Sequence, residues 1–315
     1  MNAVVQSGDD QVGSMLEKLA KLWKTRAAVN NGLQDYTNLE FEPERHDFSE
    51  VLLPFRGHAA WLEASAAQKS KVLSYAWVLY NVKTIYIETN VVAPACEDII
   101  KSPPVTSRNR ALLQTVMADA MLDEALHTRM SLEACNYIYA MRDIDYLDFS
   151  DFNLVKWRAR VLDECHAEWQ RRLTRFAIAC ASETLITDYL KVMAEDSNIQ
   201  SICHQVTKTH AVDEWSHSSV FSFVAADVLA DLSEQERRYF RTILLRTVEM
   251  FANNELGGWA KAFTLFDFPG AEAMLADTGD SNEVAIYRAS VERLIERLGL
   301  DAQRVIYSQT AQSGA

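Results

Sequence analysis

Glycine and proline are scarce in this chain, and their scarcity limits what it can fold into. The 315 residues include only 10 Gly and 6 Pro, below the average shares of about 7% and 5%. Because these two residues interrupt regular elements, their scarcity predicts long unbroken segments. No strand-like alternation of apolar and polar residues persists anywhere in the chain, so the segments are predicted to be helices.

Four long central helices are predicted, with shorter helices beside them. The long ones are expected at about 68–93, 108–141, 154–195 and 199–229, and Pro94 should end or kink the first. Shorter helices are expected over 15–30, over 282–298 and over about 233–253, where Ser233-Glu-Gln-Glu236 has the form of a capping box. Residues 37–57 should be irregular, and Gly257-Gly258 and 267–270 should form turns.

Charge and cysteine usage exclude several classes of protein. The formal net charge is −13, which argues against binding nucleic acid or an anionic membrane surface, since both need clustered Lys and Arg. No apolar run approaches the roughly 20 residues that span a bilayer. The first residues lack the basic start and apolar core of a signal peptide. The 5 cysteines form no C-x-x-C pair, so we expect buried reduced thiols and a cytoplasmic protein.

Two of the long helices carry spacings that suit a metal ion. The second has Glu124-Ala-Leu-His127, and the fourth has His210-Ala-Val-Asp-Glu214-Trp-Ser-His217. At about 100° per residue, positions i, i+4 and i+7 lie on one face of a helix. The three side chains of the second motif can therefore converge on one point. Asp213 follows His210 by three residues and is a candidate for orienting a ligand histidine from behind.

The other two long helices each place one carboxylate on an apolar face. Glu88 shares its face with Ile85, Val91 and Val92, and Glu183 shares its face with residues such as Phe176 and Ile186. An unpaired buried carboxylate costs several kcal/mol or takes up a proton, and a metal ion removes that cost. One carboxylate on each of two helices, facing two helices with Glu-x-x-His spacing, is the arrangement of di-iron carboxylate proteins.

Any one of these patterns alone has an ordinary structural explanation. A Glu-x-x-His pair usually lies on a solvated helix face, and a glutamate in an apolar helix is often a paired core acid. The joint order of one element per long helix favours a metal site. We therefore predict an all-α fold: a ferritin-like four-helix bundle core with additional flanking helices. It should form a single domain over 1–315, with its metal-binding core at about 68–229.

The ligand set resembles that of a known enzyme family. Di-iron carboxylate proteins typically use four carboxylates and two histidines, and His210 would be a third histidine. A seventh ligand of this kind is typical of the N-oxygenase family to which the p-aminobenzoate N-oxygenase of aureothin biosynthesis belongs. Every ligand position of that family is filled here, in the order Glu88, Glu124, His127, Glu183, His210, Glu214 and His217.

The resemblance implies an activity and its requirements. It implies two iron ions, with O₂ as co-substrate, that oxidise a small-molecule primary amine to a hydroxylamine and then to nitroso or nitro products. Manganese also accepts these ligand types. The chain shows no dinucleotide loop and no cysteine set for an iron–sulfur cluster, so an external electron donor or reductase is expected. A homodimer is one candidate assembly.

Family substrates often carry a carboxylate, which needs a cationic partner. Arg288, Arg293 and Arg297 in the last helix are candidates, and Arg288 is favoured because its neighbours Ile286 and Tyr287 are apolar. Two other functions stay open at this point. One is a di-iron hydroxylase, desaturase or oxidative decarboxylase acting on C–H bonds, which His210 disfavours. The other is a ferritin-like protein for iron storage or sensing, which the aromatic-rich flanks disfavour.

Overall fold

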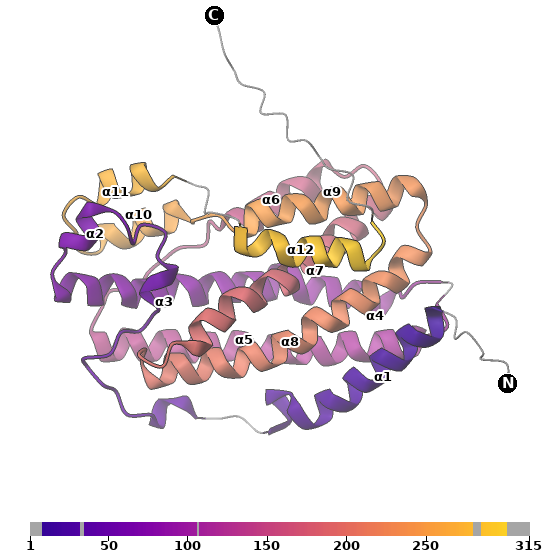
Figure 1. The fold of residues 1–315 in the computed structure, drawn as a ribbon, viewed down its shortest axis with the longest axis horizontal. Coiled ribbons are helices and arrows are strands. Elements are labelled where there is room, and N and C mark those ends of the chain that lie inside the picture. Colours follow the sequence, from indigo (N-terminus) through magenta and orange to yellow (C-terminus); the bar gives the residue numbers. More distant parts are fainter. Residues whose placement is uncertain (1–7, 32–34, 106, 280–284, 301–315) are drawn as a thin grey trace, which may run out of the picture.

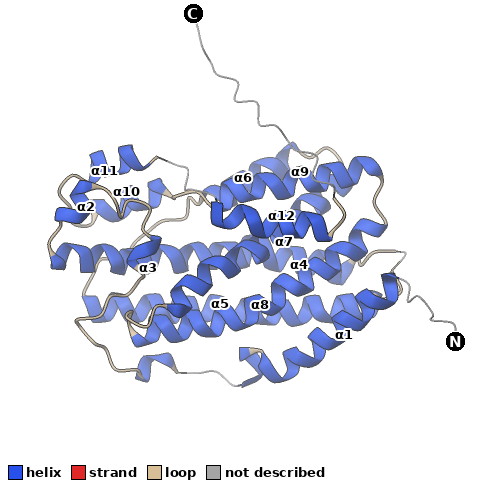
Figure 2. Cartoon of the chain, in the orientation of Figure 1, coloured by secondary structure: helices blue, strands red, loops and turns tan. Residues whose placement is uncertain are grey.

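Helices make up nearly all of the regular structure. A computed structural model of the chain describes residues 8–31, 35–105, 107–279 and 285–300. Within these ranges there is no β-strand, only an isolated bridge between His46 and Ile199. Figure 2 shows the same result as a cartoon made of helices joined by loops. The predicted all-α class is confirmed.

Twelve α-helices follow one another in the described part of the chain. They are α1 (Gly8–Arg26), α2 (Ala59–Glu63), α3 (Ala66–Ile87), α4 (Ala93–Lys101), α5 (Arg110–Arg142), α6 (Asn153–Glu164), α7 (Glu168–Glu195), α8 (Ser201–Ala230), α9 (Glu234–Phe251), α10 (Leu256–Thr264), α11 (Ala271–Thr278) and α12 (Ala285–Arg297). A π-helical turn, η4 (Glu88–Val92), joins α3 to α4, and short 3₁₀ turns occur at Ala28–Asn31 (η1), Tyr36–Asn38 (η2) and Glu50–Leu52 (η3).

Four long helices form the central bundle. Helix α3 with η4 and α4 packs on α5, α5 packs on α8, and α8 packs on α7. Helix α1 lies along the outer edge of the bundle against α5 and α8, while α9 and α12 cover α7 (Figure 1). The buried apolar side chains divide into two clusters along the bundle axis. The polar site described below lies at the level between them.

Pro94 was predicted to end or kink the first long helix, and the helix does not end there. The chain continues as a helix from Ala66 through η4 to Lys101. Proline has no backbone N–H to donate and its ring crowds the preceding turn. The wide π turn immediately before Pro94 changes the hydrogen-bond register, so the helix passes the proline without ending.

The helix predicted over 154–195 is two helices. Helix α6 ends at Glu164 and α7 begins at Glu168, and Cys165 and Ala167 have extended backbone. The Gln170 side chain accepts hydrogen bonds at 2.9 Å from the backbone N–H groups of both His166 and Ala167. Ala167 has no side-chain oxygen for a cap, so the usual Ser/Thr signal for a helix start is missing from the sequence. By contrast, the capping box predicted at Ser233 and Glu236 is present.

The Gly257-Gly258 pair lies within α10 and does not form the predicted turn. A Cβ atom at Gly258 would lie 2.6 Å from Cδ1 of Leu79 and 3.2 Å from Cε1 of Phe149. The glycine therefore allows α10 to pack closely on α3. Gly270 does form the predicted turn, with φ +77°.

Replacing Gly258 by Ala is expected to destabilise the fold by about 1–3 kcal/mol, the usual cost of overpacking a core. The matched control is Gly57→Ala, because an added Cβ at Gly57 meets nothing within 4 Å. Urea denaturation of both variants measures the difference. Equal stability of the two variants would show that α10 moves away from α3 at little cost.

No helix within the described ranges combines the length and the apolar character needed to cross a membrane.

Candidate metal centre

Seven buried side chains from four helical segments meet inside the bundle. The donor atoms form overlapping groups, each with its atoms within 4.8 Å of one another. The groups are Glu88, His127, His210 and Glu214; Glu124, His127, Glu214 and His217; and Glu88, Glu124 and Glu183. These are the seven residues predicted from the sequence, and each is at most 4% exposed. We call them the cluster; their role as metal ligands stays a prediction.

Glu214 occupies the centre of the cluster. Its Oε1 atom lies 3.2 Å from Nδ1 of His127, 3.1 Å from Nε2 of His210 and 3.4 Å from Nδ1 of His217. One carboxylate oxygen near three imidazole nitrogens can belong to two adjacent metal sites. The position follows from the sequence, since residues 210, 214 and 217 share one face of α8.

Glu88 reaches the cluster from the π turn η4. Its Oε1 atom lies 3.6 Å from Nε2 of His210. The extra residue in a π turn rotates the following side chains relative to those before it, and such turns are frequent at functional sites. This turn was not predicted, because a π turn leaves no distinctive residue pattern.

Burial sets the protonation of the outer carboxylates in the cluster. Burial, followed by the negative charges of Glu124 and Glu214, raises the pKa of Glu88 well above its ordinary value. Burial, followed by the charges of the same two residues, does the same to the pKa of Glu183. Without a metal ion, Glu88 and Glu183 are therefore held in the protonated form.

Unlike these outer carboxylates, the central residues Glu214, His127 and His217 are held in their charged forms. Burial alone would raise the pKa of Glu214, but the neighbouring His217 and the hydrogen bonds from the histidines lower it well below its ordinary value. Burial alone would lower the pKa values of His127 and His217, but the surrounding carboxylates raise both well above the ordinary value. Burial and the charge on His127 lower the pKa of His210, which stays neutral. The two imidazolium groups thus supply positive charge that a cation could replace.

The donor set fits a pair of divalent metal ions. Two buried carboxylate oxygens of the cluster, Glu88 Oε2 and Glu214 Oε2, have no hydrogen bond, and Glu124 Oε1 and Glu183 Oε2 share the single Nδ1 atom of His217 at 3.1 and 3.4 Å. Buried polar atoms without hydrogen bonds are rare and costly, and all of these point to a coordinating role. Carboxylate oxygens and imidazole nitrogens suit iron and manganese, so these residues would be able to hold such ions.

Two aspartates, Asp213 and Asp123, contact the ring nitrogens of His127 and His217 that face away from the cluster. Asp213 Oδ2 lies 3.3 Å from Nε2 of His127, and Asp123 Oδ2 lies 3.0 Å from Nε2 of His217. Each histidine therefore directs its Nδ1 atom to the cluster and its Nε2 atom to a carboxylate. An N–H···carboxylate bond on one nitrogen holds the other as a lone-pair donor, which orients the ring and raises its basicity.

Each of the two aspartates contacts a histidine on a different helix from its own. Asp213 on α8 contacts a histidine of α5, and Asp123 on α5 contacts a histidine of α8. The orienting role predicted for Asp213 agrees with this geometry, although its partner is His127 on another helix. Asp123 was not predicted. Its signal was the repeated Asp-Glu-x-x-His pattern, which occurs at Asp123 to His127 and at Asp213 to His217.

Helix α1 and the turn after it complete this outer layer. The indole Nε1–H of Trp23 donates to Asp123 Oδ2 at 2.8 Å. The backbone N–H of Ala28 donates to Asp213 Oδ1 at 3.2 Å. The N-terminal segment therefore holds both aspartates in place, one through a side chain and one through the main chain.

Replacing Asp213 by Ala is expected to weaken metal binding about 10–100-fold, the usual loss when a group behind a ligand histidine is removed. Competition with a chromophoric chelator measures the change. Glu133→Ala is the control, since Glu133 lies on the same helix as His127 and pairs with Arg129 at the surface. A D213A protein with the affinity of the control would show that His127 needs no orienting carboxylate.

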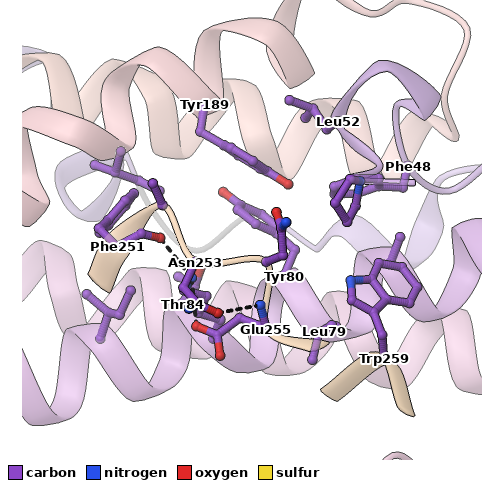
Figure 3. A pocket seen from close by; sticks show the side chains of 17 residues that line it. Phe48, Leu52, Leu79, Tyr80, Thr84, Tyr189, Phe251, Asn253, Glu255 and Trp259 are labelled. Carbon is purple, nitrogen blue, oxygen red and sulfur yellow. Dashed lines mark hydrogen bonds and ion pairs between the residues drawn. The ribbon is translucent and has the colours of Figure 1, made fainter. Parts of the chain in front are cut away.

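A cavity of about 110 Å³ lies beside the cluster. On α3 it is lined by Thr84 and Ile87, just before Glu88, and on α7 by Ile186 and Tyr189, just after Glu183. In Figure 3 the side chains of Tyr80 and Tyr189 extend toward each other across this space, and their rings are stacked with centroids 5.2 Å apart. The cavity is thus mainly apolar and aromatic.

One polar edge of the cavity is an ion pair. Lys83 Nζ lies 2.9 Å from Glu255 Oε1 and donates to the carbonyl oxygen of Phe251 at 3.1 Å. Glu255 has a left-handed backbone, with φ 53°, and its Oε2 atom accepts hydrogen bonds from the backbone and side-chain N–H groups of Asn153 at 3.1 Å. The pair offers both a donor and an acceptor to a bound molecule, and its location was not predicted.

Of the α12 arginines, the structure describes the side chains of Arg293 and Arg297, and neither lines this cavity. Arg293 and Arg297 line a separate polar hollow between α7, α8 and α12. Arg293 donates to Ser290 Oγ at 2.7 Å, and Arg297 donates to Ser222 Oγ at 3.2 Å. The side chain of Arg288, the favoured residue for binding a substrate carboxylate, lies outside the described part of the structure.

Comparison with known proteins assigns the chain to a family. Residues 9–299 match the family model of the p-aminobenzoate N-oxygenase AurF. A 4-aminobenzoate N-oxygenase of Streptomyces thioluteus is 27% identical over 302 residues, covering 93% of this chain and 89% of that protein. The match includes every helix that contributes to the cluster and the last helix, α12. The chain therefore belongs to the p-aminobenzoate N-oxygenase AurF family.

Proposed function

We propose that this protein is an O₂-dependent di-iron N-oxygenase acting on a small-molecule primary amine. The observation that carries the proposal is the meeting of seven buried donor side chains from four helical segments. Membership of an N-oxygenase family supports the same activity. A storage protein would have no use for the aromatic cavity that adjoins the cluster.

The seven cluster residues would hold the two metal ions. Glu88, Glu124, Glu183 and Glu214 supply four carboxylates, and His127, His210 and His217 supply three imidazoles. The bound irons would supply the chemistry of O₂ reduction and oxygen transfer. Glu214 lies among the three histidines and would be the most central of the carboxylates that hold the metals. Asp123 and Asp213 would keep Nδ1 of His217 and of His127 directed at the metals.

The cavity would hold the amine with its nitrogen toward the cluster. Its walls at Thr84, Ile87 and Ile186 lie within a turn of Glu88 or Glu183, and the amine would extend past these three residues toward the metals. The stacked rings of Tyr80 and Tyr189 favour a flat or apolar body. The Lys83–Glu255 pair favours a hydrogen-bonding group at the polar edge. We infer an amine with an apolar, aromatic-sized body, such as an aminobenzoate-like or amino-acid-like molecule.

Anaerobic reconstitution tests the proposal. The protein is loaded with Fe(II), exposed to ¹⁸O₂ with excess reductant, and offered a panel of aromatic and aliphatic amines with and without a carboxylate. We expect about two irons per chain and a hydroxylamine, nitroso or nitro product that carries ¹⁸O by mass spectrometry. Manganese-loaded protein is the parallel sample. A protein that holds two irons but oxygenates no amine on the panel would contradict the proposal.

A further inference from the structure

A hydrogen-bonded chain of three side chains connects the protein's outer helix with the cluster. The indole N–H of Trp23 donates to Asp123 Oδ2 at 2.8 Å, and the same oxygen lies 3.0 Å from Nε2 of His217. Nδ1 of His217 then faces three cluster carboxylates, with Glu124 Oε1 at 3.1 Å. Only side-chain atoms and two hydrogen bonds separate the indole from a proposed metal ligand.

The two aspartates accept hydrogen bonds from different kinds of donor. Asp213 is held by the backbone N–H of Ala28, a group without redox chemistry. Asp123 is held by Trp23, whose aromatic ring couples well to electron transfer. Trp23 is half-buried on α1, which lies along the outer edge of the bundle (Figure 1). If the hydrogen bond served only to position Asp123, a main-chain donor such as the one used for Asp213 would suffice.

The carboxyl-terminal half of α1, which includes Trp23, carries a charge opposite to that of the whole protein. Residues 18–26 of α1 include four cations and no acid, in a chain whose net charge is −13. The cations are Lys18, Lys21, Lys24 and Arg26, and all four are exposed. We call these four residues the α1 basic patch. A local positive patch on an acidic protein attracts and orients an acidic partner.

We propose that α1 is the docking surface for an acidic one-electron carrier protein, and that Trp23, Asp123 and His217 form the path by which its electrons reach the metal centre. The proposal rests on the di-iron N-oxygenase function, which needs electrons from outside the chain. In each transfer the carrier loses one electron and one ferric ion gains it, so two transfers convert the diferric pair to the diferrous pair. No covalent bond is made or broken along the path.

Anaerobic stopped-flow reduction of the iron-loaded protein tests the docking surface without any amine. The donor is a reduced plant-type [2Fe–2S] ferredoxin, an acidic one-electron carrier, and the loss of the ferric absorption is followed. The charge-swapped variant Lys21→Glu/Lys24→Glu should be reduced about tenfold more slowly or worse. The control Lys191→Glu/Lys261→Glu makes the same charge change at exposed positions on α7 and α10. It should change the rate by less than about twofold.

Salt and a small donor separate docking from a general effect on the metal centre. Added salt should slow the reduction of the wild-type protein by ferredoxin and have little effect on the charge-swapped variant. Dithionite, which needs no docking surface, should reduce the charge-swapped variant and its control at equal rates. Equal rates of the two variants with ferredoxin would overturn the docking surface.

The variant Trp23→Phe tests the path. It keeps an aromatic ring but loses the N–H bond to Asp123, and it should be reduced by ferredoxin at least about tenfold more slowly while binding the same amount of iron. The control is Trp215→Phe on α8, because Trp215 is 61% exposed. Reduction of W23F at the wild-type rate would overturn the path. A fall in its iron content would assign Trp23 to positioning Asp123, and would count against an electron path through the indole.

These outcomes are independent of amine oxidation. A protein that accepts electrons through α1 but oxygenates no amine would refute the proposed function and leave the electron path standing. A protein that oxygenates amines, with reduction rates insensitive to the Lys21/Lys24 swap and to W23F, would do the reverse.

Discussion

Replacing Glu183 by Gln is expected to abolish metal-dependent activity while leaving the metal-free protein folded. Glu183 is 2% exposed and belongs to the group formed with Glu88 and Glu124. A neutral amide is a poor ligand for iron, so bound metal should fall from about two ions per chain to one or fewer. The rate of N-oxygenation should fall by more than about 100-fold, because loss of a group that only orients a ligand already costs up to that much.

The folded metal-free protein should tolerate this change because its Glu183 is already neutral. Burial and the charges of Glu214 and Glu124 raise the pKa of Glu183 well above 4.5. Because the pKa is higher in the folded state, folding takes up a proton above pH 4.5, so this group makes the stability of the wild-type protein fall as the pH rises from 4.5 through the raised folded pKa. Glutamine does not titrate. After chelator treatment, the E183Q protein should therefore match the wild type near pH 4.5 and be the more stable of the two at pH 8.

Urea denaturation of the chelator-treated proteins at these two pH values, together with metal analysis, measures both effects. Glu133→Gln, a substitution at a partly exposed position on α5, controls for the loss of a carboxylate. The comparison variant is Glu214→Gln, because Glu214 is held in its charged form among the histidines. E214Q should destabilise the metal-free protein, where E183Q should not. An E183Q protein that retains two metals and full activity would remove Glu183 from the ligand set.

The positions of the cluster residues could be predicted from sequence because each motif lies within one helical segment. The spacing of His210, Glu214 and His217 places their side chains on one face whatever the rest of the fold does. Glu88 and Glu183 were recognisable because a carboxylate on an apolar face needs a partner. These inferences require only local geometry and the cost of burying charge.

Features that depend on contacts between helices could not be read in the same way. The pairing of Asp123 with His217 joins α5 to α8, and the Trp23 bond to Asp123 joins α1 to α5. Such pairs depend on the crossing and rotation of packed helices, which residue spacing does not encode. The same limit applies to the cavity, where Glu255 pairs with Lys83 across the fold.

Predictions of where helices begin and end failed at two places that lack the usual sequence signals. The break between α6 and α7 uses Gln170 to cap a turn that has no serine or threonine. The π turn at Glu88 allows the helix to continue past Pro94, where a standard helix would stop. Both exceptions lie in or next to helices that carry cluster residues.

Replacing His210 by Gln is expected to separate metal binding from N-oxygenation. The other six cluster residues are four carboxylates and two histidines, the usual set for two irons. The H210Q protein should therefore still bind about two irons per chain. His210 is neutral, because burial and the charge on His127 lower its pKa, so it can offer an imidazole lone pair without first losing a proton. Its Nε2 atom lies 3.1 Å from Glu214 and 3.6 Å from Glu88, where it would complete one metal's coordination.

Loss of this third imidazole should lower the rate of amine oxygenation by about 100-fold or more, at least the loss typical of groups behind the ligands. Single-turnover oxygenation of a reactive amine and iron analysis of the same sample make the measurement. His204→Gln on the same helix is the matched control; the ring of His204 contacts the carbonyl oxygen of Ala194 at 2.9 Å, and glutamine retains an N–H donor. Full turnover by H210Q would mean that six ligands suffice and would return C–H oxidation to consideration. Retained iron with lost turnover would identify His210 as the residue that adapts a common di-iron bundle to nitrogen.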